Sequence, residues 1–490
     1  DTGSRQEGVT PYFWSLRQFC QERLLRFLFA EADSEASQIG FAVTVALGIA
    51  LTFIPSVLLL LGNRVFWPSG KRFAKPRTQG ELTVTERYFR NAALFSMKHA
   101  KAVLLVALLI TIPATYIVLT DLPTYDLTEG APVTESGQGL EAIGAAFGYG
   151  FVYPAYVVVR FPGPVLLADG NVSVARMDTL HNLSRDMIAR EPGVKSVEGP
   201  TNPQGTDVDY RNLSSAPEAE RVAIVATMSQ YIGTDDRTVR IYVVLADRPF
   251  SRDAISAIDR LETLLAEISA SEPELAASEV YLGGVSAILN DVRDSTNRDL
   301  QIMAIVVILG LFTVLLFVLG SVLIPVRAIL TILLSIAWTL ALTIVLFHFW
   351  RGLDVIFVLP LFLFVMAMGL GMDYDIFIIT RVLEEVAHGA SDADAIAEAT
   401  TRTGGIISAC GIVMAGAFAT LMLNPSPLLQ EIGFALAFVI LLDSMVVRIY
   451  LVPAIMVLAG KYNWWAPGGL QRVRRTDAPA TGDGPADPPP

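Results

Sequence analysis

Residues 369–377 read Gly-Leu-Gly-Met-Asp-Tyr-Asp-Ile-Phe and lie near the end of an apolar run that begins at about Val355. An acidic residue at that depth in a bilayer costs about 2.5–3.5 kcal/mol on insertion scales, so a membrane protein rarely carries one without a use for it. Asp373 is therefore a candidate proton-carrying group, with Tyr374 beside it.

The rest of the chain supports a membrane location. Its 490 residues are 53% hydrophobic, with a mean hydropathy of +0.50. The apolar residues are grouped in runs of about 20, the length that spans the hydrocarbon core. These runs lie near 39–61, 102–120, 299–320, 327–348, 355–379, 404–423 and 432–460. They predict a polytopic α-helical bundle of about seven transmembrane helices, a multi-pass protein of the cell membrane.

Basic residues set the expected topology. The loop after the first run is rich in Lys and Arg, which predicts a cytoplasmic location. Alternation then places the long polar segment outside and returns the Pro- and Gly-rich tail, which we expect to be disordered, to the cytoplasm. The predicted parts are an N-terminal remnant (1–38), a first helix (39–61), a cytoplasmic linker (62–101), a second helix (102–120), an exterior domain (121–298), a five-helix bundle (299–460) and the cytoplasmic tail (461–490).

The exterior segment has the pattern of an α+β domain. Residues 155–161, 194–199, 239–245 and 280–284 are typical of strands, and 173–190 and 253–268 have helical spacing. The order predicts a ferredoxin-like βαββαβ unit with an insertion at 201–237, in which 218–229 is a further helix candidate.

Polar residues also interrupt the bundle between its fifth and sixth spans. Ser391 is followed three residues later by Asp394, in the manner of a capping box. This spacing predicts a cytoplasmic surface helix that begins there.

Composition argues against several other classes of protein. Two cysteines, Cys20 and Cys410, form no disulfide framework, and four scattered histidines form no metal cluster. The net charge of −12 argues against nucleic acid as a partner. No nucleotide-binding Gly-rich loop or catalytic motif is present in the sequence, so we expect neither a cofactor nor an enzyme.

Three Asn-x-Ser sequences lie in the predicted exterior domain. They begin at Asn171, Asn182 and Asn212 and fit the N-glycosylation pattern. They are candidate glycosylation sites and give mild support to the topology.

Several motifs together resemble one family. Besides 369–377, these are Thr403-Gly404-Gly405, the stretch 441–448 followed by 451–454, and 62–68, which reads Gly-Asn-Arg-Val-Phe-Trp-Pro. In this order, over roughly 34–465, the chain resembles the carboxyl-terminal half of an RND-superfamily transporter of the MMPL branch. The resemblance implies export of lipids or other hydrophobic or amphipathic compounds, driven by the proton motive force.

The family carries two repeats, each with its own exterior domain and Asp-Tyr pair, whereas this sequence has one. We therefore expect a fragment, or a half-transporter whose partner is the missing first-repeat half or another subunit. The other expected partners are the lipid bilayer, the hydrophobic substrate and protons.

Within the spans, Asp373 and Tyr374 are expected to form the proton relay. The alternative for Asp373 is an inter-helix hydrogen bond, and a carboxyl that faced lipid would contradict the relay. Adjacent helical positions diverge by about 100°, so Tyr374 should reach a neighbouring helix or the missing repeat. Asp375 lies about 200° from Asp373 and is expected near the cytoplasmic end, as a secondary and mainly structural residue.

Asp443 and Arg448 are a possible coupled ion pair in the last span. Their separation of five positions exceeds the usual three or four of a helical pair, although arginine is long enough to compensate. Either they pair with each other, or one of them meets Asp373. A static pair and a coupled role are both open.

Two other functions are compatible with this bundle. One is an accessory protein in protein translocation, as in the related SecD/SecF branch. The other is a sterol- or lipid-sensing module without transport.

Overall fold

A computed structural model describes residues 35–62, 82–121, 123–126, 135–167 and 171–466. The predicted remnant up to 34, the linker at 63–81 and the tail from 467 lie outside these residues. The chain divides into two units, Asp1–Glu81 and Leu82–Pro490.

The first unit is described over a single helix, α2 (Glu35–Leu61). Nearly every residue after Gly40 is apolar or small, and Thr52 and Ser56 donate their hydroxyls to carbonyls one turn earlier. A helix that satisfies its polar groups internally and exposes apolar side chains is suited to lipid.

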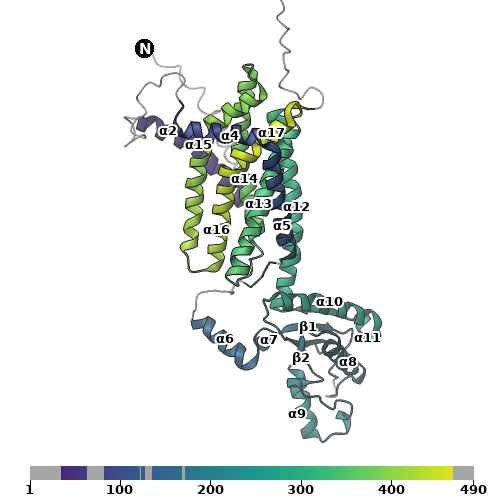
Figure 1. The fold of residues 1–490 in the computed structure, drawn as a ribbon. Helices are drawn as coiled ribbons and strands as arrows, with labels where there is room; N and C mark the ends of the chain where they lie inside the picture. The colour runs from purple at the N-terminus through teal and green to yellow at the C-terminus, as the bar shows by residue number, and fades with distance from the viewer. Residues whose placement is uncertain (1–34, 63–81, 122, 127–134, 168–170, 467–490) are drawn as a thin grey trace, which may run out of the picture. The chain divides into compact units, whose positions relative to one another are not determined.

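The second unit contains an α/β domain (Figure 1). Its strands are β1 (Ala155–Arg160), β2 (Val194–Glu198), β3 (Thr238–Leu245) and β4 (Glu279–Gly283), in the spatial order β2-β3-β1-β4, and every pairing is antiparallel. All four lie where the sequence predicts strands. Helix α8 (Val174–Arg190) connects β1 to β2, and α10 (Arg252–Ser271) connects β3 to β4.

The core of this domain lies between the sheet and these two helices. Alternate strand residues such as Val157, Ile241 and Val243 are buried against Leu180 of α8 and Leu261 of α10. The same period-2 pattern leaves the other sheet face more exposed. Shorter elements complete the domain: α6 (Glu135–Phe147), α7 (Tyr149–Val152), η2 (Pro203–Gly205), η3 (Leu213–Ser215), α9 (Glu218–Ser229) and α11 (Pro273–Ala276).

Seven helices in the described residues are long and apolar enough to cross a membrane, which confirms the predicted number. They are Ala42–Leu61, Ala100–Thr120, Val285–Leu319, Leu323–Trp350, Leu359–Ala387, Asp392–Leu423 and Pro427–Ala459. The first belongs to α2. The other six belong to the second unit, where α13, α14 and α16 lie within one bundle (Figure 1).

The elements of this bundle are α4 (Val84–Lys98), α5 (Ala100–Thr120), α12 (Val285–Leu319), α13 (Leu323–Ile344), η4 (Val345–Trp350), α14 (Leu359–Ala387), α15 (Asp392–Ala419), η5 (Thr420–Leu423), α16 (Pro427–Leu441), η6 (Leu442–Leu451), α17 (Val452–Ala459) and η7 (Gly460–Trp464). Of these, η4 and η6 are π-helical.

Helix α15 begins where the sequence predicts the start of a surface helix, and it is longer than a surface helix alone. Ser391 does cap a helix, since its Oγ accepts the backbone N–H of Asp394 at 3.2 Å. The helix then continues without a break through Gly404 and Gly405 to Ala419. The polar segment therefore belongs to the same helix as the sixth span. The two adjacent glycines do not break this helix, because it is packed on several sides.

Helix α4 falls inside the predicted linker and was not expected from the sequence. Its start is a capping box, in which Thr83 Oγ1 accepts the N–H of Glu86 and the Glu86 carboxylate accepts the N–H of Thr83 at 2.7 Å. Phe89 of α4 is buried with Ile449 of the last span.

The glycines of α14 and α15 have different surroundings. A Cβ on Gly404 would lie 2.7 Å from the Phe89 ring, and one on Gly411 would collide with Ser444. Gly371 is also closely packed, whereas Gly369 and Gly416 have nothing within 4 Å. Only part of the set therefore permits close helix approach.

The contact of α15 with α4 gives a first prediction. Gly404→Ala should destabilise the protein by about 1–3 kcal/mol, because the new methyl group overlaps the Phe89 ring. The measurement is thermal unfolding in detergent, followed by tryptophan fluorescence. Gly405→Ala is the matched control, since its Cβ would meet ordinary contacts at 3.5 Å. A Gly404→Ala protein that unfolds at the same temperature as the parent protein would contradict this packing.

Candidate functional site

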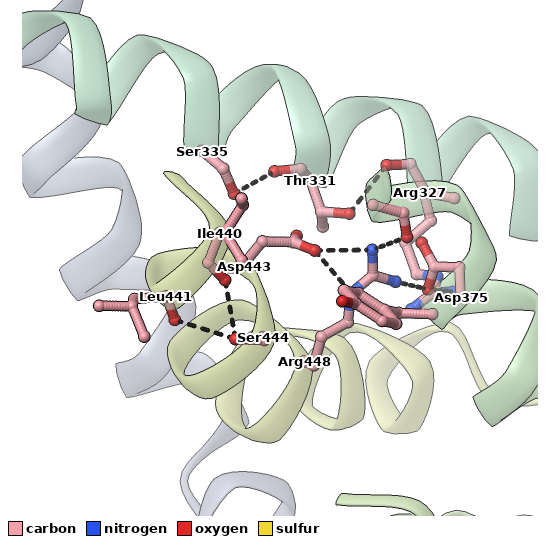
Figure 2. A network of polar contacts seen from close by, with 12 residues as sticks. Arg327, Thr331, Ser335, Asp375, Ile440, Leu441, Asp443, Ser444 and Arg448 are labelled. Atoms are coloured by element: carbon pink, nitrogen blue, oxygen red, sulfur yellow. Dashed lines mark hydrogen bonds and ion pairs between the residues drawn. The ribbon is translucent and has the colours of Figure 1, made fainter. Parts of the chain in front are cut away.

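Four charged side chains meet inside the membrane bundle (Figure 2). Arg327 comes from α13, Asp375 from α14, and Asp443 and Arg448 from η6. Each is at least nine-tenths buried, with exposed fractions of 4%, 1%, 6% and 1%, respectively. We call these four residues the charge network.

Asp375 is held by two guanidinium groups. Its Oδ1 accepts Nη2 of Arg327 at 3.1 Å and also contacts Nη1 of Arg448, whereas its Oδ2 is buried without a hydrogen-bond partner. Arg448 also donates to the carbonyl oxygen of Gly371, one turn earlier on α14. Arg448 therefore ties the last span to α14 through both a carboxylate and a backbone carbonyl.

Asp443 and Arg448 pair with each other, which is one of the two arrangements left open by the sequence. Nε and Nη2 of Arg448 lie 3.1 and 3.0 Å from Oδ2 of Asp443. Their spacing of five positions is accommodated by η6, because a π-helix bonds residue i to i+5 and brings these positions nearer to one face. Single π-turns within α-helices are frequent at functional sites.

The charges of the network balance, since two arginines face two aspartates. Burying an unpaired charge would cost several kcal/mol even after relaxation, and the ion pairs offset this cost. The offset is incomplete, because Oδ1 of Asp443 and Nε and Nη1 of Arg327 are also buried without a hydrogen-bond partner. A network with unused donors and acceptors can rearrange when a helix shifts or a proton binds.

A small cavity adjoins the network. It has a volume of about 10 Å³ and is lined by Ile332, Ser335, Ala367, Leu370, Gly371, Tyr374, Val439, Ile440 and Asp443. This is roughly the space needed for one water molecule, and a buried water needs polar partners of the kind that Asp443 and Ser335 offer.

The structure places Asp373 and Asp375 differently from the expectation. Asp373 is exposed on the outer surface of this bundle, whereas Asp375 is buried in the network. The buried positions of α14, among them Leu363, Ala367 and Gly371, recur every three or four residues, and Asp375 continues that stripe. The sequence could not give this phase, because nearly all residues of α14 before Asp373 are apolar. Asp373 therefore lies outside the charge network, on the exposed side of α14.

Tyr374 is half-buried between these two acids. Its hydroxyl donates to Sδ of Met414 on α15 at 3.3 Å, so it reaches a neighbouring helix, and its ring lines the small cavity. Tyr374 thus connects the exposed side of α14 with the cavity beside Asp443.

Arg327 was missed in the sequence because it stands at the first position of a predicted span, where a basic residue is ordinarily interfacial. A signal was present: Thr331, Ser335, Thr339 and Thr343 follow it at intervals of four. Such a row of polar residues along one face of an apolar helix indicates a buried polar seam rather than a helix end.

The remaining candidates lie away from the network. Asn182 and Asn212 are exposed and Asn171 is half-buried, all in the α/β domain. Among the described residues, no group of three or more His, Cys, Asp or Glu side chains is arranged to hold a metal ion.

Seven candidate spans, with a balanced charge network inside the bundle, define a multi-pass membrane protein. The model of the MMPL family matches residues 156–479, about two-thirds of the sequence. The chain belongs to the MMPL family.

Relatives give the scale of the match. A protein of Streptomyces coelicolor, named only as a membrane protein, is 31% identical over 87% of this chain and 46% of its own length. The apo-petrobactin exporter of Bacillus anthracis is 30% identical over 61% of this chain and 42% of its own. The sulfolipid-1 exporter MmpL8 of Mycobacterium tuberculosis is 28% identical over 56% and 24%. The chain spans about half the length, or less, of these relatives.

The two neighbouring aspartates of α14 give a second prediction. Asp375→Asn should destabilise the purified protein by about 3–5 kcal/mol, because it leaves two buried guanidinium groups short of a counter-charge. Asp373→Asn is the matched control and should change stability little, since this side chain is exposed. Unfolding in detergent by denaturant measures both. Equal effects of the two substitutions would contradict the rotation of α14 that buries Asp375 and exposes Asp373.

Proposed function

We propose that the chain is part of a secondary transporter that exports lipids or other hydrophobic or amphipathic compounds and is driven by the proton motive force. The observation that carries this proposal is the buried charge network in the bundle of an MMPL-family protein. Ionisable residues buried at membrane depth are costly, and they commonly mark proton or substrate pathways.

In this proposal, Asp443 is the group that takes up and releases the proton. Arg448 pairs with both Asp443 and Asp375. When a proton neutralises Asp443, Arg448 therefore still has Asp375 as its counter-ion. Arg448 then interacts mainly with Asp375 of α14 and less with Asp443 of its own span. Proton binding thereby changes how strongly two membrane helices are held together, which is the kind of two-state element that coupling requires.

The exposed position of Asp373 supports a further part of the proposal. An ionised carboxylate that faces hydrocarbon costs about 2.5–3.5 kcal/mol or more, so a protein surface should cover it. We assign this surface to a second membrane bundle, either the other half of a longer chain or an oligomeric partner. The relatives are roughly twice as long or longer, which agrees with this assignment. Asp373 and Tyr374 would then act as a relay at the junction of the two halves.

The α/β domain is the proposed exterior part that receives the substrate. The strand order β2-β3-β1-β4 with connections through α8 and α10 supports a ferredoxin-like topology. Two relatives are named for the export of a sulfolipid and of a siderophore, which supports an exported small molecule as the substrate. The basic loop before α5 supports a cytoplasmic location for the opposite end of the bundle.

A role in protein translocation and a lipid-sensing role are the alternatives. The family match favours export over the first of these. The four buried charges favour proton coupling over sensing, because a static sensor needs no balanced ionic centre in its bundle.

The test uses the native host. The chromosomal copy is replaced by Asp443→Asn, and lipids and secreted small molecules are compared by mass spectrometry. We expect the exported compound to fall at least about tenfold outside the cell and to accumulate inside. A protonophore should have the same effect on the parent strain. The control is Asp299→Asn at an exposed position of α12, which should export normally.

Two results would contradict the proposal. One is an unchanged export profile in cells with normal amounts of the Asp443→Asn protein. The other is an accumulation of unprocessed secretory proteins instead of a small molecule, which would favour the translocation role.

A further inference from the structure

A row of hydroxyl groups runs along α13 from the charge network. Thr331, Ser335, Thr339 and Thr343 follow Arg327 at intervals of four, and all are essentially completely buried. Positions four apart on an α-helix differ by about 40°, so the row winds slowly along one side of the helix. From Ser335 to Thr343 it covers about 12 Å at 1.5 Å per residue.

These hydroxyls bond to their own helix. Ser335 donates to the carbonyl of Thr331 at 3.1 Å, Thr339 to that of Ser335 at 2.7 Å, and Thr343 to that of Thr339 at 2.8 Å. Each oxygen retains lone pairs that can accept a further hydrogen bond. Each hydroxyl can also turn from the carbonyl toward a water molecule, because back-bonding of this kind is weak.

One end of the row meets the network. Ser335 lines the small cavity together with Asp443, whose Oδ1 is buried and has no hydrogen-bond partner. An unpartnered carboxylate oxygen beside a cavity of this size is a site where a water molecule can be stabilised. This observation is independent of the spacing of the hydroxyls.

A buried acid lies on the helix that packs beyond the other end of the row. Phe347, just beyond α13, packs against Phe434 of α16 with ring centroids 6.1 Å apart, and Arg351 donates to Gln430 at 2.7 Å. The residues that follow α13 therefore contact the first half of α16. Glu431 is in that half, is 4% exposed, and accepts the backbone N–H of Ile356 at 3.2 Å.

This end of the bundle is the one that connects to the α/β domain. Thr124, shortly after α5, exchanges backbone hydrogen bonds with Val355 and Phe357, which precede α14. The row on α13 thus leads from the network toward the end of the bundle that is joined to the domain.

We propose that Ser335, Thr339 and Thr343 line a water-accessible track that joins Asp443 to Glu431. Its role as a path for protons rests on the proposed function. A proton that enters at the domain-side end binds first to the carboxylate of Glu431. It then leaves Glu431, moves along water and hydroxyl groups to water in the cavity, and is accepted by the Asp443 carboxylate, which leaves Glu431 ionised again.

The ordinary explanation is that buried Ser and Thr only satisfy their own helix and fill space. Thr313 of α12 does this, since it is exposed on the bundle surface and donates to the carbonyl of Leu309 at 2.7 Å. It supplies a control with the same residue type and the same local bond, but outside the proposed track.

The test measures water access directly. Single cysteines are introduced as Ser335→Cys, Thr339→Cys and Thr313→Cys in the full chain, with Cys20→Ser and Cys410→Ser to remove the native thiols. The protein in lipid nanodiscs is transferred to D₂O, and infrared spectroscopy follows exchange of S–H to S–D. We expect exchange at positions 335 and 339 to be at least about tenfold faster than at 313.

Exchange at 339 and 335 that is as slow as at 313 would overturn the track. Ser335→Cys is nearly isosteric, so the result does not depend on Thr339→Cys alone. Fast exchange in a protein whose export ignores the proton gradient would leave the track standing and remove the proposed coupling. Slow exchange in a protein whose export depends on the proton gradient would overturn the track and leave the proposed coupling standing.

Discussion

The two guanidinium groups that share Asp375 impose the strictest constraint on this protein. Four charges are removed from water inside an apolar bundle, and each must find its partner within about 3 Å. The penalty for an unpaired buried charge is several kcal/mol, more than most single packing contacts contribute. The relative heights and rotations of α13, α14 and the last span are therefore fixed by these pairs as much as by apolar packing.

Other features of the bundle follow from that constraint. The π-helical segment η6 places Asp443 and Arg448, five positions apart, at hydrogen-bond distance, which the usual spacing of an α-helical pair would not favour. Gly371 leaves its carbonyl accessible to Arg448, and Gly411 allows α15 to approach Ser444, the residue after Asp443. Local helix geometry is thus adapted to the ion pairs, at positions where regular helices would separate them.

Helix α14 contributes one acid to the interior of the bundle and another to its surface. The interior network is complete in charge within this chain, whereas Asp373 has no counter-ion among the described residues and is exposed. A buried, balanced centre and an exposed acid thus share one helix, because their positions differ in rotation about its axis. The α/β domain, with its own core between the sheet and two helices, is structurally independent of that centre.

The sequence alone determined the seven spans, the positions of the four strands and the family, because these depend on run length, period-2 alternation and motif order. It also singled out Asp443 and Arg448, since charges in a long apolar run are conspicuous. It could not decide which aspartate of 369–377 is buried, because an apolar helix without a polar face gives no rotational phase. The partnership of Arg327 with Asp375 joins residues 48 positions apart. Only the packing of α13 against α14, and the π-helical turn in the last span, brought these charges together.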